Sequence, residues 1–168
     1  PDLLAEILEV AADTDILVID DNSPDGTGDW CDRFAAGEPR VQCLHRPGKL
    51  GLGTATVAAM RHAIEHDYQA LITMDADFSH DPAALPQLVT TIEKRKADVV
   101  IGSRYCDGVK IDGWPWRRRS ASRAVNATAR RLLKLTPHDC SGAFRAYRVD
   151  LLKSLDLSTI QATGYAYL

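Results

Sequence analysis

The stretch LITMDADFSHDP, residues 71–82, joins an apolar segment to the start of a helix through two carboxylates. Leu71 and its apolar neighbours predict a short buried strand. Asp81-Pro82 predicts a helix N-cap followed by proline at the first helical position. Asp75 and Asp77 lie between these two elements. Because a buried carboxylate without a positive partner is costly, we expect a cation to meet them.

Further strands are expected on both sides of this stretch. Apolar runs at 15–20, 41–46, 70–75 and 97–104 alternate with helical patterns. This order is typical of an α/β fold with right-handed βαβ units and a mostly parallel sheet flanked by helices. We find no internal repeat and no low-complexity linker, so we expect a single domain over residues 1–168. Ligands of such sheets bind at the carboxyl ends of the strands, where this chain has IDD, MDAD and GSR.

Composition narrows the class of partner. The net charge of −3 and the pI near 5.9 argue against general nucleic-acid binding. The four cysteines form no C-x-x-C pair and predict free thiols, with neither a zinc site nor a disulfide framework. No apolar run approaches the roughly 20 residues that cross a bilayer. We therefore expect any membrane role to be peripheral, or to depend on a membrane subunit or a C-terminal membrane part outside this chain.

The acidic residues at the strand ends allow two interpretations each. Asp75 and Asp77 offer hard oxygen ligands that suit Mg²⁺ or Mn²⁺ bridging to a diphosphate, or they form a helix-capping turn. Asp20 and Asp21 offer acceptors for a base N–H or a ribose hydroxyl, or they close the following loop as an Asx-turn. Arg104 offers its fork to a phosphate or pairs with Asp75 and Asp77.

Two further segments stand out. Gly51 and Gly53 imitate a dinucleotide-binding fingerprint, but Thr56 takes the place of its third glycine, so we favour a tight turn against the sheet. Seven cations lie within residues 117–134, which predict an amphipathic helix preceded by Trp114 and Trp116. Arg119, Arg123 and Arg130 fall within about 40° of one another on that helix. The basic helix is expected to lie on an anionic membrane or to hold a phosphate monoester; the alternative is a solvated face.

Five ordered motifs carry a resemblance to a known family. VIDDNSPDGTG, RPGKLGLGTA, MDADFSHDP, GSRY and DCSGAFRAYR resemble the dolichyl-phosphate (polyprenyl-phosphate) mannosyltransferases, which are inverting family 2 glycosyltransferases of GT-A fold. The likeness covers nearly the whole chain, and its most specific part is 139–148. It implies a metal-dependent transfer of mannose from GDP-mannose to the phosphate of a polyprenol or dolichol, with inversion, at the cytoplasmic face of a membrane.

The same resemblance implies roles for individual residues. It assigns the donor nucleotide to Ile19, Asp21, Asp75, Ala76, Asp77 and Arg104, the metal to Asp75, Asp77 and Ser79, and the acceptor phosphate to Arg117, Arg118, Arg119 and Arg123. Asp75, Asp77 and Arg104 would be the catalytic group. Ser79 stands where many relatives have a metal-binding glutamine, and a serine hydroxyl is a weaker oxygen donor.

Two family features are not in the sequence. The opening strand with its P-x-Y-N-E-type nucleotide loop would precede Pro1, and charged residues would follow GYAYL. We therefore expect a fragment truncated at both ends, which lacks the first strand of the GT-A fold. Two alternatives stay open: transfer of a UDP-sugar such as UDP-glucose to a polyprenyl phosphate, and a non-enzymatic nucleotide-binding module at a membrane surface.

Overall fold

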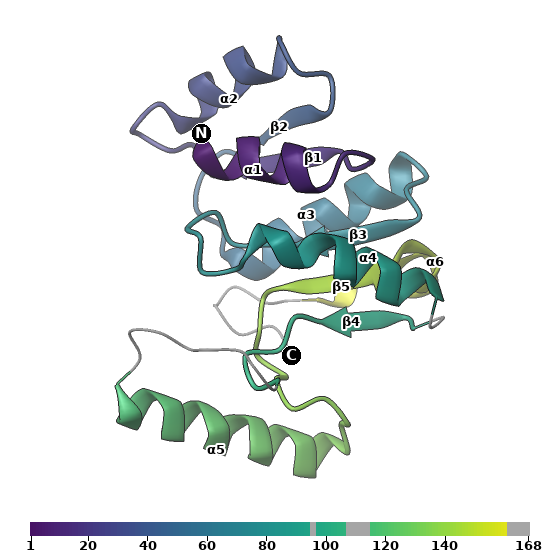
Figure 1. The fold of residues 1–168 in the computed structure, drawn as a ribbon. Helices are drawn as coiled ribbons and strands as arrows, with labels where there is room; N and C mark the ends of the chain where they lie inside the picture. Colours follow the sequence, from purple (N-terminus) through teal and green to yellow (C-terminus); the bar gives the residue numbers. More distant parts are fainter. Residues whose placement is uncertain (95–96, 107–114, 161–168) are drawn as a thin grey trace.

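Helices and strands alternate along most of the chain, as Figure 1 shows. The computed structural model describes residues 1–94, 97–106 and 115–160. The elements are α1 (Asp2–Val10), β1 (Ile16–Asp20), α2 (Thr27–Ala35), β2 (Val41–His45), α3 (Leu52–Glu65), β3 (Ala70–Thr73), η1 (Pro82–Ala84), α4 (Leu85–Lys94), β4 (Val99–Ile101), α5 (Trp116–Leu133), β5 (Arg145–Arg148), α6 (Val149–Ser154) and η2 (Leu157–Thr159). The predicted α/β class and the four predicted strands are confirmed.

The strands pair in two groups. β1 and β2 are parallel, with Ile16 opposite Val41 and Asp20 opposite His45. β5 lies between β3 and β4 and is antiparallel to both, so that β3 and β4 run in the same direction. The sequence did not predict β5, which is formed by the end of the DCSGAFRAYR motif. Parallel pairing is therefore shown for β1 and β2, whereas the unpredicted strand β5 separates β3 from β4 and is antiparallel to both.

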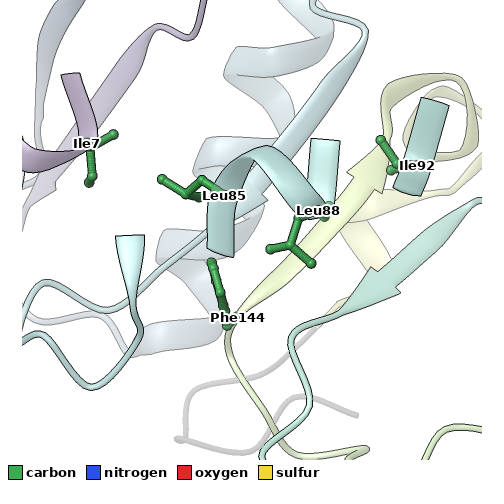
Figure 2. Packing of buried hydrophobic residues seen from close by; sticks show 6 residues of the cluster. Ile7, Leu85, Leu88, Ile92 and Phe144 are labelled. Atoms are coloured by element: carbon green, nitrogen blue, oxygen red, sulfur yellow. The ribbon is translucent and has the colours of Figure 1, made fainter. Parts of the chain in front are cut away.

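Helices cover both faces of β5. Because alternate residues of a strand point to opposite faces, Ala146 and Tyr147 belong to different clusters. Ala146 packs into a cluster that Figure 2 draws, with Phe144, which directly precedes β5, and with residues of α1 and α4: Ile7, Leu85, Leu88 and Ile92. Tyr147 packs on the other side against α3 and α6, in a cluster with Met60, Ala63, Val149, Leu152 and Leu157. A third cluster joins Leu4, Cys31 and Val41, beneath α2. β5 thus carries the core that positions the strand ends.

The loop after β3 has the predicted cap. Asp81 Oδ1 accepts a hydrogen bond of 2.9 Å from the backbone N–H of Ala83, and Pro82 begins the short helix η1. β3 itself ends at Thr73, two residues earlier than the acidic pair. Asp75 and Asp77 therefore lie in a loop, where their side chains are not bound by the alternation of a strand.

Candidate functional site

The Asp75–Asp77 loop does not cap the following helix, because Asp81 does so. Asp77 Oδ1 accepts a hydrogen bond of 2.9 Å from the backbone N–H of Ser79, and Phe78 between them has a φ of 59°. The hydrogen bonds from Ser79 lower the pKa of Asp77, so this carboxylate is ionised. No described residue donates a hydrogen bond to the Asp75 carboxylate. Asp77 is exposed and Asp75 is half-buried, so the expectation that these carboxylates are buried is wrong. The loop presents acidic oxygens at the end of β3.

His80 is a member of this loop that the sequence analysis missed. Its Nδ1 accepts a hydrogen bond of 3.1 Å from the backbone N–H of Asp75. Its ring stacks on Phe144, with centroids 5.0 Å apart and planes at 14°. Burial lowers the pKa of His80, which favours the neutral imidazole with its proton on Nε2. His80 therefore ties the acidic loop to β5, and only the fold reveals this, since Phe144 is distant in the chain.

Arg104 follows β4 and pairs with Asp139, a partner that the sequence analysis did not name. Nε and Nη2 of Arg104 donate to the two carboxylate oxygens of Asp139 over 2.7 and 2.6 Å, and Nη2 also donates to Ser141 over 3.0 Å. Asp139 is fully buried. Although burial raises the pKa of Asp139, hydrogen bonds and charge from Arg104 lower it overall, so the pair is ionised. The interpretation in which Arg104 pairs with Asp75 and Asp77 is therefore wrong, because its guanidinium pairs with the buried Asp139.

Tyr105 brings two predicted arginines together. The Cζ atoms of Arg104 and Arg123 each lie 5.9 Å from the centroid of its ring. The Tyr105 hydroxyl donates to Ser122 Oγ over 2.6 Å, which fastens α5 beside the end of β4. Asn126 adds a second attachment, because its Oδ1 accepts the backbone N–H of Cys140 over 2.6 Å. The residue predicted for the donor and a residue predicted for the acceptor thus share one aromatic ring.

The helix α5 confirms the predicted amphipathic segment, and its apolar side faces outward. Figure 1 shows α5 set apart from the strands. Its protein-facing side is polar, with Ser122, Asn126 and Arg123 in the contacts just given. Ala124, Val125, Thr128, Ala129, Leu132 and Leu133 of α5 line an apolar groove. Val125 is 56% exposed and Leu132 is 76% exposed, far more than aliphatic residues of a packed helix.

The remaining predicted arginines lie at the start of α5. Arg117, Arg118 and Arg119 are exposed, and Arg117 Cζ lies 5.5 Å from the ring of Trp116, which is 72% exposed. Trp114 lies outside the described residues. Among the parts of the chain that are described, no helix combines the length and the apolar character that crossing a bilayer requires.

The residues predicted to contact the nucleoside lie at the end of β1. Ile19 lies in β1, and Asp20 beside it is buried and accepts long hydrogen bonds from the backbone N–H of Ser23. Asp20 therefore closes the following loop, although its bonds reach three residues along the chain and not the two residues of the predicted Asx-turn. Asp21, by contrast, makes a two-bond ion pair with Arg46, over 2.6 and 2.7 Å. The two adjacent acids have separate partners, and Arg46 is a partner that the sequence analysis did not predict.

One group with mixed ligands was also missed, because its members come from two elements. Asp32 of α2 and Cys43 and His45 of β2 have potential ligand atoms within 4.8 Å of one another. His45 Nε2 is already within 2.9 Å of Asp32 Oδ1. Burial raises the pKa of Cys43 to about 12, so its thiol is protonated. The thiols of all four cysteines are free, as predicted, and this group is a hydrogen-bonded contact between α2 and β2.

The sequence is similar to that of known proteins over nearly its whole length. The model of the glycosyl transferase family 2 matches residues 1–156. The undecaprenyl-phosphate mannosyltransferase of Micrococcus luteus is 44% identical over 99% of this chain and 68% of its own length. The polyprenol monophosphomannose synthase of Mycolicibacterium smegmatis is 39% identical over 99% of this chain and 63% of its own length. The chain thus spans about two thirds of the length of these curated relatives.

Proposed function

The chain belongs to glycosyl transferase family 2, and we propose that it transfers mannose from GDP-mannose to the phosphate of a polyprenol, with inversion at C1 of the sugar. The names of both relatives support mannose as the sugar and a polyprenyl phosphate as the acceptor. One feature of the structure carries the proposal. His80 stacks on Phe144, whose carbonyl oxygen accepts the backbone N–H of Gly102 after β4, and Tyr105 contacts both Arg104 and Arg123. These contacts join the acidic loop, the end of β4 and α5. These are the parts assigned to metal, donor and acceptor.

The acidic loop is proposed to bind a Mg²⁺ or Mn²⁺ ion. Its candidate ligands are the carboxylates of Asp75 and Asp77 and the hydroxyl of Ser79, all hard oxygen donors. The fit is good because Asp77 is ionised and no described residue neutralises either acid by an ion pair. A bound ion would neutralise the donor's diphosphate and stabilise it as the leaving group. Ile19, Asp21 and Ala76 are proposed to contact the rest of the donor nucleotide.

The arginines are proposed to reduce the electrostatic repulsion between the donor and the acceptor. Donor and acceptor are both anionic, so their approach requires positive groups that are fixed in advance. Arg104 is held rigidly by Asp139 and is proposed to touch the donor phosphates. Arg123, with Arg117, Arg118 and Arg119, is proposed to bind the acceptor phosphate. Because the attacking phosphate oxygen is already negative, no general base is needed, and an approach opposite the leaving group gives inversion.

The outward face of α5 supports a position at a membrane surface. Apolar side chains such as Val125 and Leu132 are exposed, and the helix start carries arginines and the exposed Trp116. A helix of this kind lies in the interface of an anionic bilayer, with its apolar side toward the acyl chains. We propose that the protein works there, at the cytoplasmic face, where the phosphate of a polyprenol is within reach.

The test is transfer of labelled mannose from GDP-mannose to a polyprenyl phosphate by the full-length protein, with Mn²⁺ or with EDTA. We expect product only with the metal, and a loss of about a hundredfold or more in Asp77→Asn, as for removal of one electrostatic contributor to catalysis. Asp156→Asn is the matched control, because Asp156 is also an exposed carboxylate that accepts the backbone N–H of a serine two residues on, and it should retain activity. Arg123→Ala should raise the KM for the lipid phosphate and leave GDP affinity unchanged.

Three outcomes would oppose the proposal. Preference for UDP-glucose over GDP-mannose would establish the UDP-sugar alternative. Nucleotide and vesicle binding without product, unchanged in Asp77→Asn, would establish the non-enzymatic module. Equal loss of donor and acceptor binding in Arg123→Ala would remove this arginine from the acceptor site.

A further inference from the structure

The geometry points to Arg46 as a positioning residue that fixes the Asp21 carboxylate for the nucleoside of the donor; this inference rests on the proposed function. Arg46 follows β2 and Asp21 follows β1, so the pair closes the carboxyl ends of two neighbouring parallel strands. The two bonds, Nε to Oδ1 at 2.6 Å and Nη2 to Oδ2 at 2.7 Å, form a planar fork on the carboxylate. A bidentate pair of this kind fixes the orientation of the carboxylate and also stabilises its negative charge.

Arg46 is itself held in place on several sides. Its side chain is 8% exposed, although a guanidinium normally reaches water. Its Nη1 donates to Thr54 Oγ1 over 2.7 Å, and that hydroxyl donates to the carbonyl oxygen of Gly51 over 2.7 Å. Its backbone N–H donates to the carbonyl oxygen of Asp20 over 2.8 Å. The fork is thus tied to β1 and to the N-terminus of α3.

The turn before α3 has a geometry that suits this role. Gly51 has a φ of 96°, a region that residues with a side chain rarely adopt, and it precedes the first turn of α3. This turn places Thr54 under the guanidinium. The glycine segment that imitates a dinucleotide fingerprint therefore serves as a support for Arg46 and, through it, for Asp21.

The chemical consequence concerns the acceptor capacity of Asp21. An ionised carboxylate has about four lone-pair sites, and the fork of Arg46 uses two of them. The others remain for donors, and the edge of a guanine or the hydroxyls of a ribose supply such groups. Without Arg46 the side chain of Asp21 is free to rotate, and the site would have to order it during binding at an entropic cost.

The experiment measures binding of two probes to the full-length protein with Mn²⁺: GDP, and inorganic pyrophosphate, which lacks the nucleoside. For Arg46→Met we expect GDP to bind about tenfold or more weakly and pyrophosphate to bind unchanged, because only the nucleoside contacts Asp21. Arg40→Met is the matched control, since Arg40 also has an ion pair, to Glu38 at 3.3 Å, and also bonds backbone carbonyls. It should leave both affinities unchanged.

Two further variants separate positioning from a general structural role. In the Asp21→Asn background, Arg46→Met should cause no additional loss of GDP affinity, because it acts through Asp21. Arg46→Lys keeps the charge and the fold but offers a point donor in place of the fork, so it should bind GDP with intermediate affinity. If Arg46→Met is too unstable to assay, this lysine variant decides the question.

The outcomes are distinguishable from failure of the proposed function. If the unaltered protein binds neither GDP nor GDP-mannose, the proposed function fails and the inference fails with it. If the unaltered protein binds GDP but Arg46→Met, or Arg46→Lys in its place, binds GDP equally well, the inference alone is overturned. Equal weakening of GDP and pyrophosphate would also overturn it, because Arg46 would then support the whole fold.

Discussion

The candidate site is held together by pairs of residues that are far apart in the chain. Arg104 bonds Asp139, Arg46 bonds Asp21, and His80 stacks on Phe144. Each pair joins the end of one strand to a different element. A buried ion pair costs desolvation, and it persists here with short bonds and additional partners such as Ser141. These pairs therefore act as fixed supports for the groups that would meet the substrates.

Gly102 offers a test of one such support. A methyl group at this position would overlap the Phe144 ring, on which the His80 ring stacks. We expect Gly102→Ala to lower the free energy of unfolding by about 1–3 kcal/mol, the usual cost of overpacking. Gly48→Ala is the control, because nothing lies within 4 Å of an added Cβ there. Urea unfolding of both variants measures the difference, and equal stability would show that Phe144 moves aside freely.

The charged residues of the candidate site could be predicted from the sequence, but their partners could not. Asp75, Asp77, Asp21 and Arg104 were predicted because each follows an apolar strand, a signal that needs only local sequence. Their partners were not, because the contact of Arg104 with Asp139 depends on the position of β5. The sequence thus identifies charged groups at strand ends, and only the fold identifies what holds them.

At the scale of elements, α2 and β2 are joined by a contact that depends on pH. His45 Nε2 lies 2.9 Å from Asp32 Oδ1, and Asp20 Oδ2 lies 3.8 Å from its other ring nitrogen. The hydrogen bond to Asp32 raises the pKa of His45, and the charges of Asp32, Asp20 and Asp29 add to it, against the effect of burial. The protonated imidazole is therefore favoured in the folded state.

The sign of the pH effect follows from the raised pKa. The contribution of His45 to stability is fully present below its unfolded pKa of about 6.5, and it is lost as the pH rises through the folded value. An NMR titration should give His45 a midpoint above about 6.5, and Asp32→Asn should lower that midpoint. Thermal unfolding of His45→Gln should lack this part of the pH dependence. An unchanged midpoint in Asp32→Asn would exclude Asp32 as the cause.

Elements differ in how well their sequence predicts them. The strands β1 to β4 lie in mostly apolar runs and were predicted within a few residues. β5 was missed because its four residues, RAYR, have arginine at both ends. Arg145 Nε donates to the carbonyl oxygen of Gly142 over 2.7 Å, and Arg148 Nη2 donates to that of Ile92 over 2.9 Å. A local hydrogen bond of Arg145 and a tertiary hydrogen bond of Arg148 therefore allow a polar segment to occupy the middle of a sheet.

At the scale of the whole molecule, α5 reverses the usual arrangement of a surface helix. Helices at the surface of a globular protein turn an apolar stripe toward the core. Here the contacts with the rest of the protein are polar, through Ser122 and Asn126, and the apolar Val125 and Leu132 are exposed. The sequence predicted the amphipathic helix from its spacing, but spacing alone cannot state which side faces the protein. The orientation came from the structure.

This orientation predicts binding to anionic vesicles. Val125→Ser with Leu132→Ser removes two exposed apolar side chains from the outward face of α5. Full burial of one such side chain contributes about 1.5–3 kcal/mol, so partial insertion of both should account for roughly tenfold in vesicle affinity or more. Cosedimentation of the 168-residue chain with vesicles that contain an anionic phospholipid measures this.

The matched control is Leu50→Ser with Leu155→Ser, because these leucines are 52% and 49% exposed but lie outside α5. It should bind vesicles as the unaltered chain does. Raised salt should weaken binding of all variants, since the arginines of α5 contribute an electrostatic attraction that counterions screen. Equal losses in the two double variants would mean that general surface hydrophobicity drives the binding. A full loss in salt alone would leave the cations, and not the apolar side of α5, as the membrane contact.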